Sequence, residues 1–110
     1  MHLIDQREEP IELGPLADGS YCFIHPKAKP LVTQGDKGDD WYVAVLGMGT
    51  RGKMLGIEGW YPVRGFKTKE DAVCLHDMLL SGSVLWKDAT EVPIRDGKRS
   101  LIHQARVLLP

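Results

Sequence analysis

Two strand-like runs joined by a glycine-rich stretch constrain this fold more than any other feature of the chain. The first run, WYVAVL at residues 41–46, is rich in aromatic and β-branched residues and lies between acidic and glycine-rich turns. The second, MLGIEGWYPV at residues 54–63, resumes strand character, although its glycines and Pro62 are typical of a bulged or edge strand. Together they predict an antiparallel hairpin whose first strand lies near the centre of a sheet.

Shorter strands are predicted on both sides of this hairpin. Residues 20–26, SYCFIHP, follow an Asp-Gly turn and favour a strand that Pro26 closes. Residues 31–34 form a short second strand, and residues 83–86, SVLW, are interpreted as a return strand. The first 19 residues mix acids, prolines and glycines, which is typical of a loose or edge segment.

One helix is predicted over residues 69–81. Thr68 can cap it, Asp71 places negative charge near its amino terminus, and Gly82 supplies the stop. An apolar stripe at helical spacing predicts the face that packs on the sheet: Ala72, Leu75, Met78 and Leu79, widened by Val73 and Leu80.

The carboxy-terminal segment supports two interpretations. Asp96-Gly97 is a two-residue hairpin signal. Residues 100–110, SLIHQARVLLP, fit either a strand or a second helix, and the helix is favoured because its apolar stripe avoids His103.

Size and composition favour one folded domain over residues 1–110. A chain of 110 residues can bury about two thirds of its unfolded surface. Its 43% hydrophobic and 26% charged residues are ordinary for a globular domain. The predicted fold class is α+β: an antiparallel sheet of about four to five strands, with the main helix (about 69–81) packed on one face and a possible second helix at the carboxy terminus.

The glycine spacing between the hairpin strands resembles a phosphate-binding loop. Gly47, Gly49 and Gly52 fit G-x-G-x-x-G, but a dinucleotide site requires a helix after the third glycine, and the glycines and proline that follow disfavour one. A glycine-rich loop of a protein kinase is not supported, because the chain lacks the kinase catalytic motifs and the second lobe of a kinase. A Walker loop is not supported, because its G-K-[ST] ending is missing. The stretch is therefore interpreted as a pliant hairpin tip that carries Arg51 and Lys53 and does not lead into a helix.

Aromatic and basic residues interleave from the hairpin to the helix start. Residues 51–69 contain five basic residues and a single acid. Single-strand nucleic-acid binders use such a mixture, but burial of the rings beneath a solvated basic rim is more common. Trp, Tyr and Arg are also enriched at protein interfaces. The predicted partner-binding residues are Arg51, Lys53, Trp60, Tyr61, Arg64 and Lys67.

No metal site or cofactor is predicted. Cys22 and His25 are spaced C-x-x-H, but Cys74 and His76 point about 200° apart on a helix and cannot share one ion. The acids at residues 36–40 lack the ligand pattern of a calcium loop.

No catalytic residues are predicted either. The chain has no serine-elbow, zinc-protease or cysteine-protease motif, so an enzymatic role would need a pocket that holds His25 or His76 beside an acid.

The resulting functional hypothesis is a small non-enzymatic protein that binds another protein, as an accessory subunit or inhibitor. The alternative is a nucleic-acid-binding module that uses the basic hairpin and nearby aromatics; a net charge of −1 requires a local patch for this. A homodimer would also fit.

The chain shows no secretory or membrane segment, which predicts a cytoplasmic location with both cysteines free. A phage or mobile-element origin would suit the size.

Overall fold

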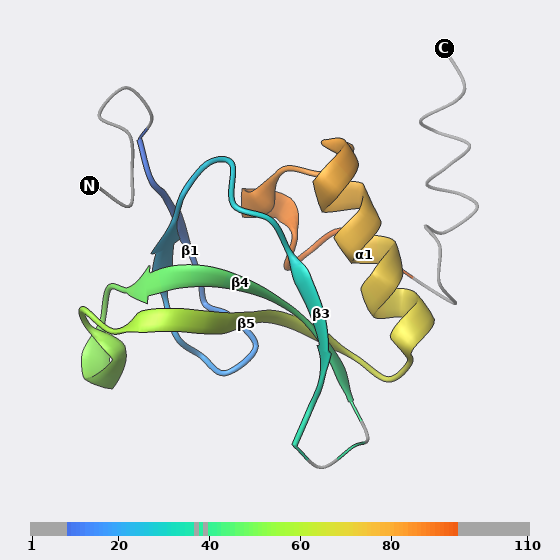
Figure 1. Cartoon of the computed structure of the whole chain (residues 1–110), viewed down its shortest axis with the longest axis horizontal. Coiled ribbons are helices and arrows are strands. Elements are labelled where there is room, and N and C mark those ends of the chain that lie inside the picture. Colours follow the sequence, from blue (N-terminus) through green and yellow to red (C-terminus); the bar gives the residue numbers. More distant parts are fainter. Residues whose placement is uncertain (1–8, 37, 39, 95–110) are drawn as a thin grey trace.

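A long hairpin forms the middle of the fold. In the computed structural model, which describes residues 9–36, 38 and 40–94, β4 (Trp41–Gly49) pairs antiparallel with β5 (Glu58–Phe66) (Figure 1). Val43 pairs with Arg64, whereas its neighbour Ala44 pairs with Pro62, so Val63 is an extra residue in β5. This is the bulge that the glycines and proline of the second run predict.

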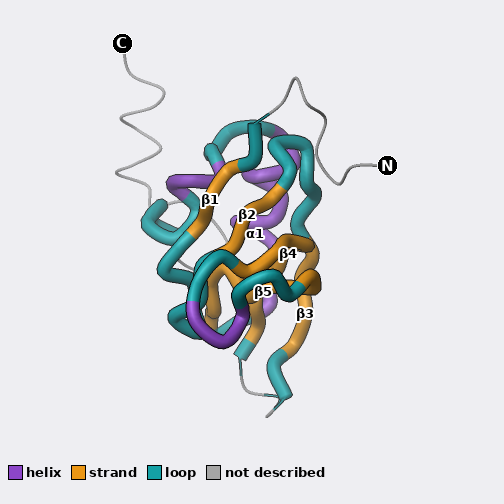
Figure 2. The backbone as a smooth tube through the Cα atoms, turned by 90° about the vertical axis from the view of Figure 1, so that its left-hand side faces the viewer, coloured by secondary structure: helices purple, strands orange, loops and turns teal. Residues whose placement is uncertain are grey.

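Three short strands complete a five-stranded sheet: β1 (Ile11–Leu13), β2 (Cys22–Ile24) and β3 (Leu31–Gln34). β2 pairs with one end of β4 and β3 with the other, both antiparallel, while β1 pairs with the outer edge of β2. Figure 2 shows β1 and β2 toward one end of the sheet and β3 toward the other. The predicted central position of the 41–46 strand is confirmed, because β4 contacts β2, β3 and β5.

The helix α1 (Lys69–Ser81) has the predicted bounds. Thr68 Oγ1 accepts a hydrogen bond from the backbone N–H of Asp71 at 3.2 Å, and Gly82 ends the helix in the left-handed region at φ 81°. The buried positions are Ala72, Leu75 and Leu79. Because α1 packs on β4, β3 and β5, the predicted α+β arrangement of one helix on an antiparallel sheet is confirmed.

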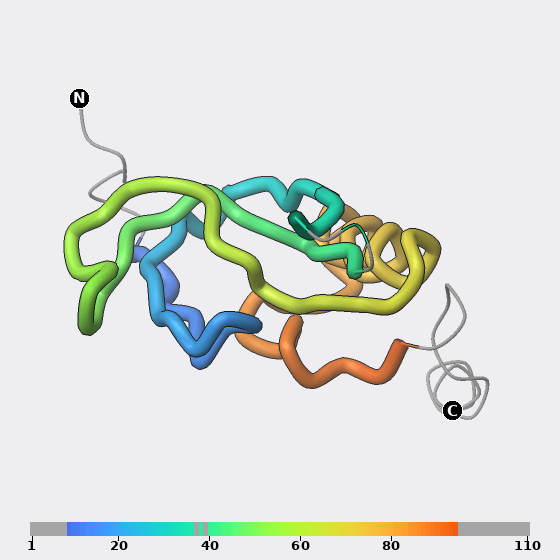
Figure 3. Tube along the Cα trace, turned by 90° about the horizontal axis from the view of Figure 1, so that it is seen from below, coloured from blue at the N-terminus to red at the C-terminus, as the bar shows by residue number. Residues whose placement is uncertain are grey.

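The segment after α1 differs from its prediction as a strand. Val84 and Trp86 are buried and Leu85 is exposed, which gives the alternation of a strand in the sequence. The backbone instead turns: the N–H of Asp88 bonds to the carbonyl of Leu85, in the three-residue 3₁₀ turn η2 (Trp86–Asp88). Figure 3 shows this segment, orange to red, running beside β5.

The core lies between the sheet, α1 and the segment around η2. Alternate residues of β4 and β5 enter it, with the helix positions and the buried residues that follow α1. The main contributors are Val43, Val45, Tyr61, Val63, Phe66, Ala72, Leu75, Leu79, Val84, Trp86, Ala89 and Val92. The predicted turn at residues 96–97 and the second helix at 100–110 fall outside the described residues.

Candidate functional site

The hairpin tip is bonded to the rest of the sheet. The N–H of Gly49 bonds to the carbonyl of Ile57 at 2.9 Å, and the N–H of Gly56 bonds back to Gly49 at 2.8 Å. The N–H of Thr50 bonds to the carbonyl of Tyr21 at 3.0 Å, which ties the tip to the segment that leads into β2. These backbone hydrogen bonds join the hairpin tip to the sheet and to the segment before β2.

The tip also contains a helical turn that the sequence did not predict. The 3₁₀ turn η1 (Gly52–Met54) begins at the third glycine of the string. It spans three residues before the chain enters β5, so it lacks the aligned amides and dipole of the α-helix that a dinucleotide-binding loop requires.

At two positions of the G-x-G-x-x-G string, backbone geometry explains the presence of glycine. A Cβ on Gly49 would lie 1.9 Å from the carbonyl oxygen of Met54, and Gly52 adopts φ 62°. Close backbone approach and a left-handed conformation therefore account for these positions without a ligand.

Arg51 contacts two side chains of the amino-terminal segment at the surface. Its Nε lies 3.7 Å from Oε2 of Glu12, and its guanidinium stacks 3.9 Å from the centroid of the Tyr21 ring. Thr50 Oγ1 donates to the same Glu12 oxygen at 2.8 Å. The side chain of Arg51 is exposed, but its charge is already compensated. Lys53 is exposed at the tip and makes no ion pair within the described residues.

The neighbours Trp60 and Tyr61 lie on opposite faces of β5. Trp60 is 55% exposed, whereas Tyr61 is 1% exposed and donates its hydroxyl to the carbonyl of Ile57. Burial removes Tyr61 from any surface that is open to a partner, because alternation along a strand sends the two rings in opposite directions.

Arg64 also serves the fold. Its Nη1 donates to the carbonyl oxygens of Ala89 at 3.2 Å and Val92 at 2.6 Å, and its guanidinium lies 4.8 Å from the centroid of Phe66. Burial lowers the pKa of Arg64, and the nearby carboxylate of Asp71 opposes this shift. Arg64, a predicted contact residue, thus links β5 to the segment after η2 through hydrogen bonds.

The face of the sheet that points away from the core carries an exposed apolar cluster. Register places Phe23 beside Met48 and Leu46 beside Trp60, while Leu31 pairs with Ala44 in the next row. The helix α1 packs with core residues such as Val43 and Val45, whose side chains alternate to the opposite face of β4. We call the exposed cluster the outer face and define it by Phe23, Leu31, Leu46, Met48 and Trp60, which are between 38% and 55% exposed.

Of the outer-face residues, only Trp60 was predicted. The missed signal is in β4, where the side chains that alternate away from the core are also apolar. A strand that is apolar on both faces is buried on both faces or meets a partner on one of them.

A cleft of about 860 Å³ opens beside the outer face. Trp60 and Tyr42 contribute aromatic rings, and Asp18, Asp36 and Asp40 contribute carboxylates. Lys67 reaches it from the loop before α1, and its Nζ lies 3.5 Å from Oδ1 of Asp40. The remaining lining comes from Ala17, Thr33, Gln34, Gly35, Ala44 and Pro62.

A second, smaller hollow of about 460 Å³ lies at the end of α1. Its walls are mainly apolar, with Leu80, Leu85 and Trp86 on one side. Three lysines also line it: Lys27, Lys29 and Lys87.

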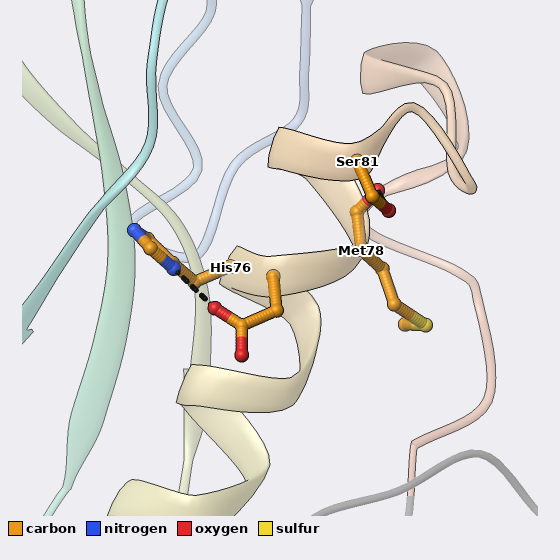
Figure 4. Close-up of polar contacts among 4 residues, drawn as sticks. His76, Met78 and Ser81 are labelled. Atoms are coloured by element: carbon orange, nitrogen blue, oxygen red, sulfur yellow. Dashed lines mark hydrogen bonds and ion pairs between the residues drawn. The ribbon is translucent and has the colours of Figure 1, made fainter.

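His25 and His76, the two histidines among the described residues, each make a polar contact with a residue close in sequence. His76 Nδ1 lies 2.9 Å from Oδ1 of the adjacent Asp77 on α1, and Ser81 Oγ donates to the carbonyl of Met78 at 3.1 Å (Figure 4). His25 Nδ1 accepts from the N–H of Lys27 at 2.9 Å. Neither histidine lines either hollow described above.

Neither Cys22 nor Cys74 forms a disulfide, and Cys22 is fully buried. Burial raises the pKa of the Cys22 thiol to about 11, with further contributions from the charges of Asp18 and Glu12. Within residues 9–36, 38 and 40–94, no three histidine, cysteine or acidic side chains gather as metal ligands would.

Among the helices that the structure describes, none has the length and apolar character to cross a bilayer. Comparison of the chain with protein-family models, curated proteins and solved structures gave no match, so the proposals below rest on the geometry of the outer face and the cleft.

Proposed function

We propose that this chain is a small non-enzymatic binding protein that contacts another protein through the outer face. One observation carries the proposal: strand pairing brings five large apolar side chains to one face of the sheet, where each remains 38–55% exposed. Soluble proteins rarely expose a contiguous apolar patch unless it meets a partner. Trp60 is the expected anchor, because tryptophan dominates binding energy at many protein interfaces.

The charges around the outer face favour a protein partner over nucleic acid. Phe23 and Trp60 offer rings on which bases could stack, but a single-strand binder also needs cations that follow the phosphates. Arg51 at the hairpin tip is paired with Glu12, and Lys67 in the cleft is paired with Asp40. The described lining of the adjoining cleft includes three carboxylates, which would repel a phosphate backbone.

Binding through this face suits an accessory subunit or an inhibitor. Such proteins act by occupying a partner's surface, and they need an exposed anchor on a rigid support more than a reactive group. The support here is the paired β4–β5 hairpin, with the bonded tip at its end.

The test is affinity capture of partners from a lysate of the source cells, quantified by mass spectrometry. We expect Trp60→Ala and Leu46→Ala to lose the same captured protein, which wild type retains in stoichiometric amount. The matched control is Leu85→Ala, because Leu85 is 58% exposed but lies at the smaller hollow.

The proposal fails if Trp60→Ala and Leu46→Ala capture as wild type does, or if wild type captures no protein that depends on these residues. The nucleic-acid alternative requires a mobility shift with single-stranded DNA or RNA that weakens with added salt. Such a shift, lost in Trp60→Ala, would replace protein binding as the function of this face.

A further inference from the structure

The cleft beside the outer face has the chemistry of a site for an organic cation. Its lining combines the aromatic rings of Trp60 and Tyr42, the apolar side chains of Ala44 and Pro62, and three described carboxylates. Strand pairing fixes this arrangement, since Ala44 is paired with Pro62 and lies two residues from Tyr42 on the same face of β4. Trp60 belongs to both the outer face and the cleft.

Among the described residues that line the cleft, acidic side chains outnumber basic ones. Asp40 is paired with Lys67, whose side chain is 91% exposed. Asp18 accepts a hydrogen bond from the backbone N–H of Ser20 at 3.0 Å and makes no ion pair within the described residues. Asp36 also lines the cleft and is exposed. Among the described lining residues, three carboxylates therefore meet one cation, Lys67.

We propose that the cleft receives an arginine side chain of the partner protein while the outer face holds the apolar part of the same partner segment. Arginine suits the two elements together, because its planar guanidinium stacks on aromatic rings and binds carboxylates through a fork of N–H donors. The fold uses the first of these contacts itself, with Arg51 over Tyr21 and Arg64 over Phe66.

This inference rests on the proposed function, because it names the chemistry of the partner. An apolar segment with one or more arginines complements the outer face and its acidic cleft. A second copy of the chain presents the same carboxylates and would oppose them across a symmetric contact.

The probe is N-acetyl-arginine-N-methylamide, titrated into the full chain while the Trp60 indole N–H and the amide signals are followed by NMR. We expect saturable shifts at Trp60, Tyr42 and Asp36. The same derivative of citrulline, which keeps the shape without the charge, should bind at least about fivefold more weakly, as expected for loss of a cation–π contact and an ion pair.

The test variant is Asp18→Asn with Asp36→Asn. Asparagine keeps the acceptor oxygen that holds the turn at Ser20, so the double variant removes charge with little change in shape. The matched control is Asp88→Asn with Glu91→Gln, which removes two exposed charges outside the cleft.

We expect the test variant to weaken binding of the arginine probe at least about fivefold and the control variant to leave it unchanged. The arginine site would be overturned if the two double variants weakened binding of the arginine probe equally. It would also be overturned if the citrulline derivative bound as tightly as the arginine probe, or if no saturable shift occurred. Concentration-dependent dimerisation that the test variant abolishes would assign the cleft to a second copy and also overturn it.

The two proposals fail separately. If Trp60→Ala and Leu46→Ala lose the captured protein while the Asp18/Asp36 variant retains it at full affinity, the outer face stands and the arginine site falls. If the arginine probe binds as expected but no captured protein depends on Leu46, the cation site stands and the function of the outer face falls.

Discussion

Nη1 of Arg64 lies 2.6 Å from the carbonyl oxygen of Val92, and this contact joins β5 to a segment 28 residues later in the chain. The same nitrogen donates to Ala89. Both segments also contribute to the core, so Arg64 links the segment that contains Ala89 and Val92 to the hairpin. A residue that suggests a binding surface in the sequence is thus part of the fold.

Replacing Arg64 should destabilise the protein without removing its contact surface. We expect Arg64→Gln to lower the free energy of unfolding by about 2 kcal/mol, because hydrogen bonds to a charged donor contribute about 1.5–3 kcal/mol. Urea unfolding measures the loss. Below the unfolding midpoint, partner capture should match wild type; lost capture by a folded Arg64→Gln protein would return Arg64 to the binding surface.

Trp60 and Tyr61 should separate binding from stability. Tyr61→Ala should cost about 3–5 kcal/mol, because it empties a large buried site in the core. Trp60→Ala should cost less than about 1 kcal/mol, the scale of one exposed cross-strand pair. Thermal unfolding of the two variants tests this, and a larger loss for Trp60→Ala than for Tyr61→Ala would contradict the assignment of the two faces.

The stability cost of replacing a glycine of the string should depend on the local backbone geometry at that position. Gly52→Ala places a Cβ in open space at a left-handed φ and should cost about 1 kcal/mol. Gly49→Ala should cost more, because its Cβ would overlap the backbone oxygen of Met54 and the turn must move. The measurement is chemical denaturation of both variants, and equal costs would show that backbone conformation alone explains the string.

The Cys22 thiol should resist modification while the protein is folded. Its pKa is raised to about 11, above the usual thiol value near 8.5, so little thiolate forms near neutral pH. In a Cys74→Ala background, we expect iodoacetamide to label Cys22 at pH 8 only after urea is added. Rapid labelling of the native protein at that pH would contradict the burial of this thiol.

The raised pKa of the Cys22 thiol also predicts how the free energy of unfolding depends on pH. The folded state binds the Cys22 proton more tightly than the unfolded state, so this contribution is fully present below the unfolded pKa. It is lost as the pH rises from about 8.5 to about 11. Cys22→Ala should flatten the decline in unfolding free energy over this window; an unchanged slope would assign the decline to other groups.

The helix start offers a smaller and more local prediction. Thr68→Ala removes the acceptor for the N–H of Asp71 and should lower the free energy of unfolding by about 1 kcal/mol. Thr68→Ser keeps that acceptor and should remain close to wild type. Similar losses in both variants would mean that the cap contributes little and that the Thr68 methyl group matters instead.

The elements with strong local patterns were predictable from sequence. The helix at 69–81 follows from Thr68, Gly82 and a 3.6-residue apolar period, and the hairpin follows from two β-branched and aromatic runs around a glycine turn. These signals act within a few residues of each other, so their meaning changes little with the surroundings.

The roles of the site residues depend on contacts that no local pattern encodes. Trp60 and Tyr61 are adjacent, yet the direction of the pleat exposes one and buries the other. Arg64 became a clamp because a segment 25–28 residues later supplies carbonyl oxygens beside it. In the same way, Val84 and Trp86 alternate as a strand would, but the chain turns there to fill the core beneath the sheet.

The sequence by itself determined one helix, a central hairpin and the apolar character of β4 on both faces. Only the tertiary structure decided which face α1 covers, and therefore which apolar side chains remain exposed for a partner. The physical reason is that burial is a property of the assembled layers: Leu46 and Val45 are neighbours of similar hydrophobicity, and only packing against α1 and the segment around η2 distinguishes them.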